Sequence, residues 1–268
     1  MIRTPVLAAC AALMFVFSFL SVKPFLQPRM VAIGAPKADA TAGYNVTYAN
    51  AKTLPEYFVA VLSDPRLKID SVVVRIMTSK KKGKIDYGFL FADSSVQKGK
   101  RFMQKRRTIL ANAYRKYGVP PNFTTAVLKL ETDLGDFVGN HLVVNSLFTI
   151  CLTSPKRSKS AAEELWRFLE LSKKNGWDPL SIKSSWAGAF GIPQFMPRSF
   201  DYAVDGNGDE IVDLFNEDDA IMSAGNFLKI HGWRDGDPAS EKKALRSYNK
   251  GSYADAVIKY AAMLEKTR

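Results

Sequence analysis

Residues 118–134, GVPPNFTTAVLKLETDL, set the fold expected for this chain. A turn-forming Gly-Val pair leads into two prolines, and proline is tolerated at the first position of a helix, where its missing N–H would have no helical partner. The apolar side chains that follow are three and four positions apart, which places them on one helix face. We therefore predict a helix over Asn122–Leu134 whose core-facing stripe is Phe123, Ala126, Val127, Leu130 and Leu134.

Glu131 lies on this apolar stripe. In one interpretation its carboxylate borders the stripe and reaches water, with Lys129 as a surface partner. In the other it occupies a dry pocket, where desolvation raises its pKa and keeps it protonated. A carboxyl that is protonated near neutral pH is suited to act as a general acid. The stripe alone is compatible with both interpretations.

Apolar residues with helical spacing predict further helices elsewhere, and strand patterns are few. Residues 71–77 alternate poorly and are compatible with either helix or strand. The expected fold class is therefore mainly α. The other predicted helices cover Leu54–Leu62, Val96–Tyr117, Ser160–Lys173, Asp218–His231 and Tyr253–Leu264.

The composition indicates a globular protein with an anionic partner. The chain has 268 residues, of which 47% are apolar, so it can bury a real core and is neither a disordered tail nor a small disulfide scaffold. Its net charge of +12 favours a polyanionic wall or a lipid surface. The basic runs lack aromatic interleaving, zinc-finger spacing and a phosphate-binding glycine loop, so nucleic acid is not an expected partner.

The N-terminal segment carries a targeting signal. Arg3 precedes an apolar stretch, residues 6–22, that is close to the minimum of ~17 residues for a membrane-spanning helix. Ala38-Asp39-Ala40 has the small-x-small form of a cleavage site. A cleaved signal peptide and an uncleaved inner-membrane anchor both agree with these features. We therefore assign residues 1–40 to export or membrane attachment with a linker, and residues 41–268 to the folded domain of an exported, periplasmic or envelope protein.

The run SSWAGAFGIPQFMPRSF, residues 184–200, mixes small residues, aromatics and isolated polar groups. Glycine and alanine let the backbone approach a ligand closely, and Trp186, Phe190 and Phe195 are candidates for stacking on sugar rings. A tight helix–helix contact lined by small residues would give the same pattern. If the run lines a saccharide groove, the residues that would bond to hydroxyl or acetamido groups are Ser185 and Gln194.

Three blocks of the sequence resemble, in order and spacing, the lytic murein transglycosylase B family. They are Leu130-Glu131-Thr132, the run AGAFGIPQFMP at 187–197, and Leu245-Arg246-Ser247-Tyr248-Asn249. The resemblance covers about residues 54–264. It implies a lysozyme-like helical fold and cleavage of the β-1,4 bond between N-acetylmuramic acid and N-acetylglucosamine in peptidoglycan. The family leaves a 1,6-anhydromuramyl end instead of a hydrolysed one.

The resemblance also implies roles for individual residues. Carried over by position, the catalytic glutamate is Glu131, and the substrate-binding residues are Ser185, Gln194, Tyr248 and Asn249. The family usually continues Thr-Arg-Trp-Gly after its glutamate, whereas this chain continues Thr-Asp-Leu-Gly. The departure affects substrate contacts near the acid and leaves the acid itself in place.

A single catalytic carboxylate is the favoured mechanism. Hydrolysing glycosidases generally use two carboxylates, one on each side of the bond. On an ideal helix Asp133 and Asp136 would be rotated from Glu131 by about 200° and about 140°, so neither would face the same cleft. The C6 hydroxyl of muramic acid then replaces water as the nucleophile. Two alternatives remain: a muramidase that hydrolyses the same bond, and a peptidoglycan-binding protein with weak catalysis.

Residues 205–211, DGNGDEI, place oxygen ligands at alternate positions, like the start of an EF-hand loop. Glu210 occupies the usual glycine position and Asn216 the position of the usual glutamate, and an Asx-rich turn without metal would show the same pattern. The resemblance implies a compact loop that is closed by a later aspartate and holds a structural Ca²⁺. Its predicted ligands are Asp205, Asn207, Asp209, the carbonyl of Ile211, and Asp219.

Overall fold

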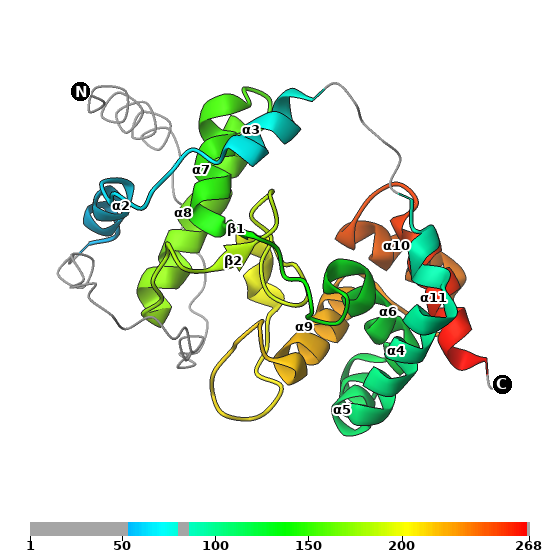
Figure 1. Ribbon diagram of the computed structural model, residues 1–268. Helices are drawn as coiled ribbons and strands as arrows, with labels where there is room; N and C mark the ends of the chain where they lie inside the picture. The colour runs from blue at the N-terminus through cyan, green and yellow to red at the C-terminus, as the bar shows by residue number, and fades with distance from the viewer. Residues whose placement is uncertain (1–52, 80–85, 267–268) are drawn as a thin grey trace. The chain divides into compact units, whose positions relative to one another are not determined.

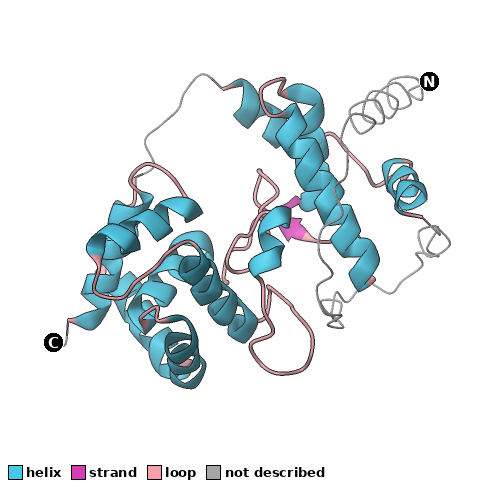
Figure 2. Cartoon of the chain, turned by 180° about the vertical axis from the view of Figure 1, so that it is seen from behind, coloured by secondary structure: helices cyan, strands magenta, loops and turns pink. Residues whose placement is uncertain are grey.

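The computed structural model describes residues 53–79 and 86–266, so the predicted signal or anchor segment lies outside the described residues. Helices make up nearly all of the regular structure, with one short pair of strands (Figure 2), which confirms the expected mainly α class. In the described ranges no helix has the length and apolarity needed to cross a bilayer. These residues divide into two compact units.

Unit 1 comprises residues 53–79, Asn140–Ala189 and Met196–Arg198. Helix α7 lies along α8, and α3 packs against α7 (Figure 1). Two short antiparallel strands pair His141 with Ser184. Its elements are α2 (Leu54–Leu62), α3 (Ser71–Thr78), β1 (His141–Leu142), α7 (Val143–Thr153), α8 (Ser158–Asn175) and β2 (Lys183–Ser184).

Local capping explains where the first helices of unit 1 begin. Thr53 and Glu56 form a capping box at the start of α2, which satisfies two backbone N–H groups that have no helical partner. The Asp70 side chain accepts hydrogen bonds from the N–H groups of the second and third residues of α3. This cap resolves the ambiguity of residues 71–77 in favour of a helix.

Unit 2 comprises residues 86–139, Phe190–Phe195 and 199–266. Helix α6 contacts α4, α5, α9 and α11, and α5 also packs against α9 (Figure 1). The 3₁₀ helix η2 (Pro197–Tyr202) begins in unit 1 and ends in unit 2. The other elements are η1 (Gly88–Phe91), α4 (Asp93–Lys105), α5 (Arg107–Tyr117), α6 (Pro121–Thr132), α9 (Glu217–Ile230), α10 (Pro238–Tyr248) and α11 (Tyr253–Glu265).

Helix α6 is buried on nearly every side, so the prediction of a single apolar face was wrong. Thr124, Thr125 and Lys129, which the stripe leaves on the polar face, are all buried. The reason is that four neighbouring helices surround α6, so the helix has no solvated face of useful width. The helix also ends at Thr132, two residues before the predicted end, because the next two residues have positive φ.

The predicted helix over 96–117 is two helices, α4 and α5. The chain breaks at Arg106, whose φ of −106° and ψ of 23° leave the helical region. The Arg106 guanidinium pairs with Glu217 and Asp218 in the first turn of α9. This contact with α9 depends on tertiary structure, which apolar periodicity does not reveal.

Candidate active site

Glu131 lies in the last turn of α6 and is half-buried. Tyrosines from three other segments interact with its charge: Tyr87 precedes η1, Tyr248 ends α10, and Tyr253 begins α11. Burial raises the pKa of all three phenols, and the nearby carboxylate raises each further. The three phenols therefore stay protonated beside Glu131 and can act as hydrogen-bond donors.

The acidity of Glu131 is strongly perturbed. Burial raises its pKa from 4.5 to about 7, because the charged form loses its hydration. The Tyr253 hydroxyl favours the carboxylate and lowers the pKa, although the two groups are not in normal hydrogen-bond geometry. Lys129 is buried and pairs with Asp133, so it is not the surface partner considered for Glu131. The raised pKa favours the dry-pocket interpretation, in a residue that keeps part of its surface exposed.

The hydroxyls of Tyr248 and Tyr253 are buried, and neither has a hydrogen-bond partner of normal geometry among the described residues. Leaving a buried hydroxyl unpaired costs ~1–3 kcal/mol. We therefore expect these hydroxyls to bond to water or to a ligand beside Glu131. The sequence singled out Tyr248 for this region, whereas Tyr87 and Tyr253 were not predicted as site residues.

Gln194 is held in a tight turn of unit 2. Phe190 and Phe195 form an antiparallel bridge around the turn, and Gln194 has a φ of 50°. Its side-chain nitrogen donates to the carbonyl of Gly191 at 2.9 Å and to that of Val138 at 3.2 Å. The amide oxygen is thus the Gln194 atom left to accept a hydrogen bond from a ligand.

The end of α6 is bonded to the same turn. Thr132, the residue after Glu131, donates its hydroxyl to the carbonyl of Ile192 at 2.8 Å. Because Ile192 and Gln194 belong to one tight turn, this bond links the placement of Glu131 to that of Gln194.

Phe190 and Phe195 are not available for sugar stacking, so that prediction was wrong. Their side chains are only 1% and 2% exposed. Phe195 packs against Phe227 and Tyr248 at ring-centre distances of 5.4 and 6.0 Å. These aromatics form core under the site, where Phe195 supports Tyr248.

The two remaining predicted substrate-binding residues are Ser185 and Asn249. Ser185 belongs to unit 1, where its hydroxyl oxygen accepts the N–H of Ala189 at 3.2 Å. Asn249 is the exposed C-cap of α10, and its side-chain oxygen accepts the N–H of Lys250 at 2.8 Å. Unit 2 thus contains Glu131, Gln194, Tyr248 and Asn249, and the roles of all five residues stay predictions.

The carboxylates nearest Glu131 in sequence are engaged by lysines. Lys98 of α4 pairs with Asp133 at 2.6 Å and with Asp136 at 2.5 Å. Asp133 also pairs with Lys129. Among the described residues, no neighbouring carboxylate contributes to the raised pKa of Glu131. The expectation that Asp133 and Asp136 do not serve as a second catalytic group stays a prediction.

The acidic loop forms a network of hydrogen bonds with its own backbone. Asp205 accepts the N–H of Gly208 at 2.6 Å and that of Glu210 at 2.9 Å. The side-chain oxygen of Asn207 accepts the N–H of Asp209 at 3.0 Å. No cluster of three or more His, Cys, Asp or Glu side chains suited to hold a metal ion occurs in the described ranges. The side chains thus form Asx turns, and a converged EF-hand arrangement is not formed.

The donor atoms of this loop nevertheless suit a hard cation. All of the predicted ligands are oxygens, the class that Ca²⁺ prefers. Asp219 is 1% exposed, and burial together with the charge of Asp205 raises its pKa. Burial and the charge of Asp209 likewise raise the pKa of Asp213. A bound cation would relieve this repulsion among carboxylates, so the residues present fit Ca²⁺ chemically.

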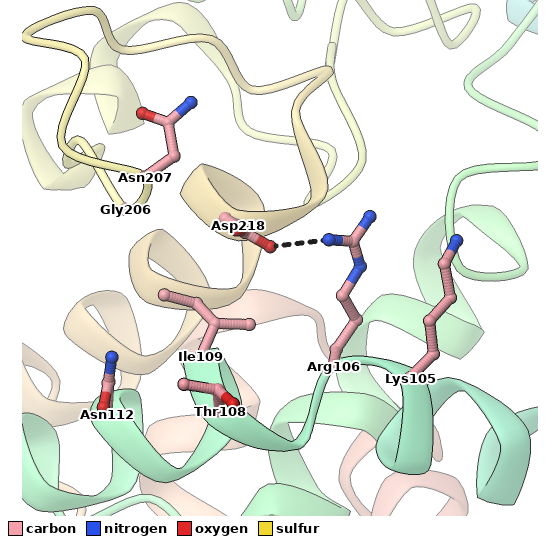
Figure 3. Close-up of a pocket in the computed structure, with 8 residues that line it drawn as sticks. All are labelled: Lys105, Arg106, Thr108, Ile109, Asn112, Gly206, Asn207 and Asp218. Atoms are coloured by element: carbon pink, nitrogen blue, oxygen red, sulfur yellow. Dashed lines mark hydrogen bonds and ion pairs between the residues drawn. The ribbon is translucent and has the colours of Figure 1, made fainter.

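A separate pocket lies beside this loop, where α4 meets α5 (Figure 3). The ion pair between Arg106 and Asp218, 3.1 Å long, lies among its walls. Glu131 and the three tyrosines are not part of it, so it is distinct from the candidate active site. Its lining residues are Lys105, Arg106, Thr108, Ile109, Asn112, Gly206, Asn207 and Asp218.

Comparison with known proteins identifies similar sequences. A family model described as the transglycosylase SLT domain matches residues 39–263. Membrane-bound lytic murein transglycosylase B of Escherichia coli (strain K12) is 38% identical over 144 residues, which cover 53% of this chain and 40% of that protein. The chain therefore spans less than half the length of this curated relative.

Solved structures share the fold. The structure of the Escherichia coli lytic transglycosylase Slt35 in complex with calcium is 23% identical, has a TM-score of 0.70, and is matched over 90% of this chain and 98% of that chain. SltB3 from Pseudomonas aeruginosa, in complex with NAG-anhNAM-pentapeptide, is 28% identical with a TM-score of 0.60, over 64% of this chain and 47% of that chain. The helical fold is therefore one found in lytic transglycosylases.

Proposed function

Since the chain belongs to the transglycosylase SLT domain family, we propose that it cleaves the β-1,4 bond between N-acetylmuramic acid and N-acetylglucosamine in peptidoglycan, leaving a 1,6-anhydromuramyl end. The observation that carries this proposal is the Glu131 carboxyl, whose pKa is raised to about 7 beside three tyrosines. The NAG-anhNAM-pentapeptide bound to SltB3 contains an anhydro sugar of the kind this reaction would form.

The reaction needs one group that first gives and then takes a proton. Protonated Glu131 donates to the glycosidic oxygen as the bond from that oxygen to the anomeric carbon breaks. The resulting carboxylate accepts the proton of the muramic C6 hydroxyl, whose oxygen bonds to the same anomeric carbon. The leaving sugar keeps the first proton, and Glu131 ends protonated as it began. A pKa near the working pH makes both transfers accessible to one carboxyl.

Tyr253 contributes to the second half of this cycle. Its hydroxyl favours the ionised form of Glu131, as the lowering of the Glu131 pKa by Tyr253 indicates. The hydroxyl thus stabilises the carboxylate after the first proton transfer, while burial favours the protonated form before it. Tyr248, whose hydroxyl is also buried and unpaired, is placed to donate to a substrate oxygen beside Glu131.

The product distinguishes this reaction from hydrolysis. We expect mass spectrometry of muropeptides released from purified peptidoglycan by the full-length protein to show 1,6-anhydromuramyl ends. Reducing muramyl ends would instead establish a muramidase and require a second group to activate water. Wall binding without any released product would favour a peptidoglycan-binding protein with weak catalysis.

We also propose that the acidic loop, with Asp205, Asn207, Asp209, Ile211 and Asp219, binds Ca²⁺ as a structural ion. Oxygen donors, burial of Asp219 and mutual repulsion of the carboxylates support this assignment. The calcium complex of Slt35, which shares the fold, is consistent with it. The ion would fix the loop ahead of α9 and take no part in the chemistry.

Calcium is expected to raise the melting temperature of the protein after treatment with a chelator. A ligand that binds only the folded state stabilises it by ~2.7 kcal/mol at about 100 times its dissociation constant. Asp205→Asn keeps an Asx turn possible but removes one charge, so the calcium-dependent increase should shrink. Differential scanning calorimetry with Ca²⁺, with Mg²⁺ and without metal measures this. Equal melting temperatures in all three conditions would show that the loop is an Asx turn without a metal.

We place the reaction in the cell envelope. The apolar stretch at residues 6–22 supports export or attachment to the inner membrane, and the Escherichia coli relative is named as membrane-bound. Peptidoglycan is a polyanionic wall polymer, which agrees with the net charge of +12.

A further inference from the structure

The backbone just after Glu131 adopts an unusual conformation. Asp133 and Leu134 have φ values of 55° and 66°, in the left-handed region that glycine adopts freely and other residues rarely do. The N–H of Leu134 donates to the carbonyl of Leu128 at 3.1 Å, and the Leu134 side chain is buried. This N–H thus reaches back six residues and closes the end of α6 at backbone positions where glycine is usual. This helix end determines where the last turn of α6, which carries Glu131, stops.

Two lysines hold this helix end. Lys129, one turn earlier on α6 and 6% exposed, pairs with one carboxylate oxygen of Asp133. Lys98 of α4 pairs with the other oxygen at 2.6 Å and with Asp136 at 2.5 Å. Burial opposes ionisation of Asp133, but hydrogen bonds from Lys129 and Lys98 outweigh it and lower the Asp133 pKa. Asp133 therefore stays charged, and a single ammonium group joins α4 to both acids of the turn.

The same turn continues to Gln194. The N–H of Gly135 donates to the Thr132 hydroxyl oxygen at 3.1 Å, while that hydroxyl donates to Ile192. The carbonyl of Val138 then accepts the amide of Gln194. Hydrogen bonds thus connect the segment between Asp133 and Val138 to the end of the helix that carries Glu131. They also connect it to the side-chain amide of Gln194, the predicted substrate-binding group.

We propose that Lys98, Lys129 and Asp133 form a positioning clamp that fixes the end of α6 and thereby holds Glu131 and Gln194 in the relation the reaction requires. The inference rests on the proposed role of Glu131. Asp133 is one of the two positions at which this chain departs from the usual Thr-Arg-Trp-Gly continuation. Lys98 acts through Asp133, and its ammonium is not among the groups that set the Glu131 pKa.

Lys98→Met removes the charge at similar length and tests the clamp in the full-length protein. We expect kcat per folded molecule to fall roughly ten- to hundredfold, because small displacements of a catalytic group are costly, while KM changes less than about twofold. The midpoint of the pH–rate profile should not move. Lys98→Arg keeps the charge and should restore most of kcat. Lys105→Met, on the same helix but 65% exposed, is the matched control and should leave kcat unchanged.

A second variant distinguishes loss of the clamp from loss of folding. Asp133→Asn removes the charge but keeps a residue that tolerates left-handed backbone, so it should lower kcat as Lys98→Met does. If Lys98→Met shows no cooperative melting, Asp133→Asn decides. Wild-type kcat in the folded charge-removing variants, or equal losses in Lys98→Arg and Lys98→Met, would overturn the clamp. An active Glu131→Gln enzyme would instead overturn the proposed function, so the two failures are distinguishable.

Discussion

Replacing Glu131 with glutamine is expected to lower turnover by roughly 10²- to 10⁴-fold, the contribution typical of a positioned general acid and base. Glutamine has nearly the same volume, so folding and binding to the wall should persist. Its amide can neither give a proton to the glycosidic oxygen nor take one from the C6 hydroxyl. Release of muropeptides from purified peptidoglycan, followed by mass spectrometry, measures the rate, and a pull-down with insoluble peptidoglycan measures binding.

The same variant should lose a pH dependence that the wild type shows. The folded protein holds Glu131 at a pKa of about 7, above the ordinary 4.5, so folding favours the protonated form. The associated stability is fully present below about pH 4.5 and is lost as the pH rises through about 7. Urea unfolding across this interval should therefore show a decline in the wild type that Glu131→Gln lacks. The wild-type rate should also fall above about pH 7, as the acid loses its proton.

A matched control is Glu241→Gln on α10. Burial raises the pKa of Glu241 as well, but it does not belong to the group around Glu131, so its amide variant should keep wild-type turnover. Undiminished activity in Glu131→Gln would remove Glu131 from its role. Parallel stability curves for wild type and Glu131→Gln would mean that the carboxyl is not desolvated in the folded state.

Apolar periodicity predicted most of the helices of the folded domain but missed two of them. Helices α8, α9 and α11 lie close to their predicted ranges; α8 and α11 alternate buried and exposed residues, whereas α9 is buried continuously from Asp219 to Gly225. Helix α7 was not predicted, although Val143, Leu147 and Ile150 are four and three positions apart; its residues from Val143 to Cys151 are all buried. Helix α10 was also missed, although Asp237 caps it and proline follows at its first position, a start signal visible in the sequence.

The candidate site was predictable where a residue lies in a motif and not where it arrives from a distant segment. Glu131 and Tyr248 were identified from blocks that resemble a known family. Tyr87 and Tyr253 approach Glu131 only in the folded chain, and no spacing links them to it. Phe190 and Phe195 were assigned to sugar stacking because composition alone does not distinguish a groove aromatic from a core aromatic.

Replacing Gly191 with alanine is expected to cause a large loss of stability. Gly191 has a φ of 75°, and a Cβ there would lie 2.4 Å from the Cβ and 2.8 Å from the carbonyl oxygen of Leu214. A backbone oxygen cannot rotate away as a side chain can, so the turn itself must move. We expect a cost of roughly 4 kcal/mol or more, the size seen when a core is overpacked at a strained backbone position.

Gly118 provides the comparison that isolates the steric part. It caps α5 with a similar φ of 69°, but nothing lies within 4 Å of its added Cβ. Gly118→Ala should therefore cost only about 1 kcal/mol, the penalty of left-handed backbone alone. A domain of this size loses about 2–4 °C of melting temperature per kcal/mol. The melting temperature should therefore fall by roughly 3 °C in Gly118→Ala and by roughly 10 °C or more in Gly191→Ala. Equal decreases in the melting temperature of the two variants would mean that the turn containing Gln194 can move away from Leu214 at little cost. The hydrogen bond between this turn and the end of α6 would then not fix its position.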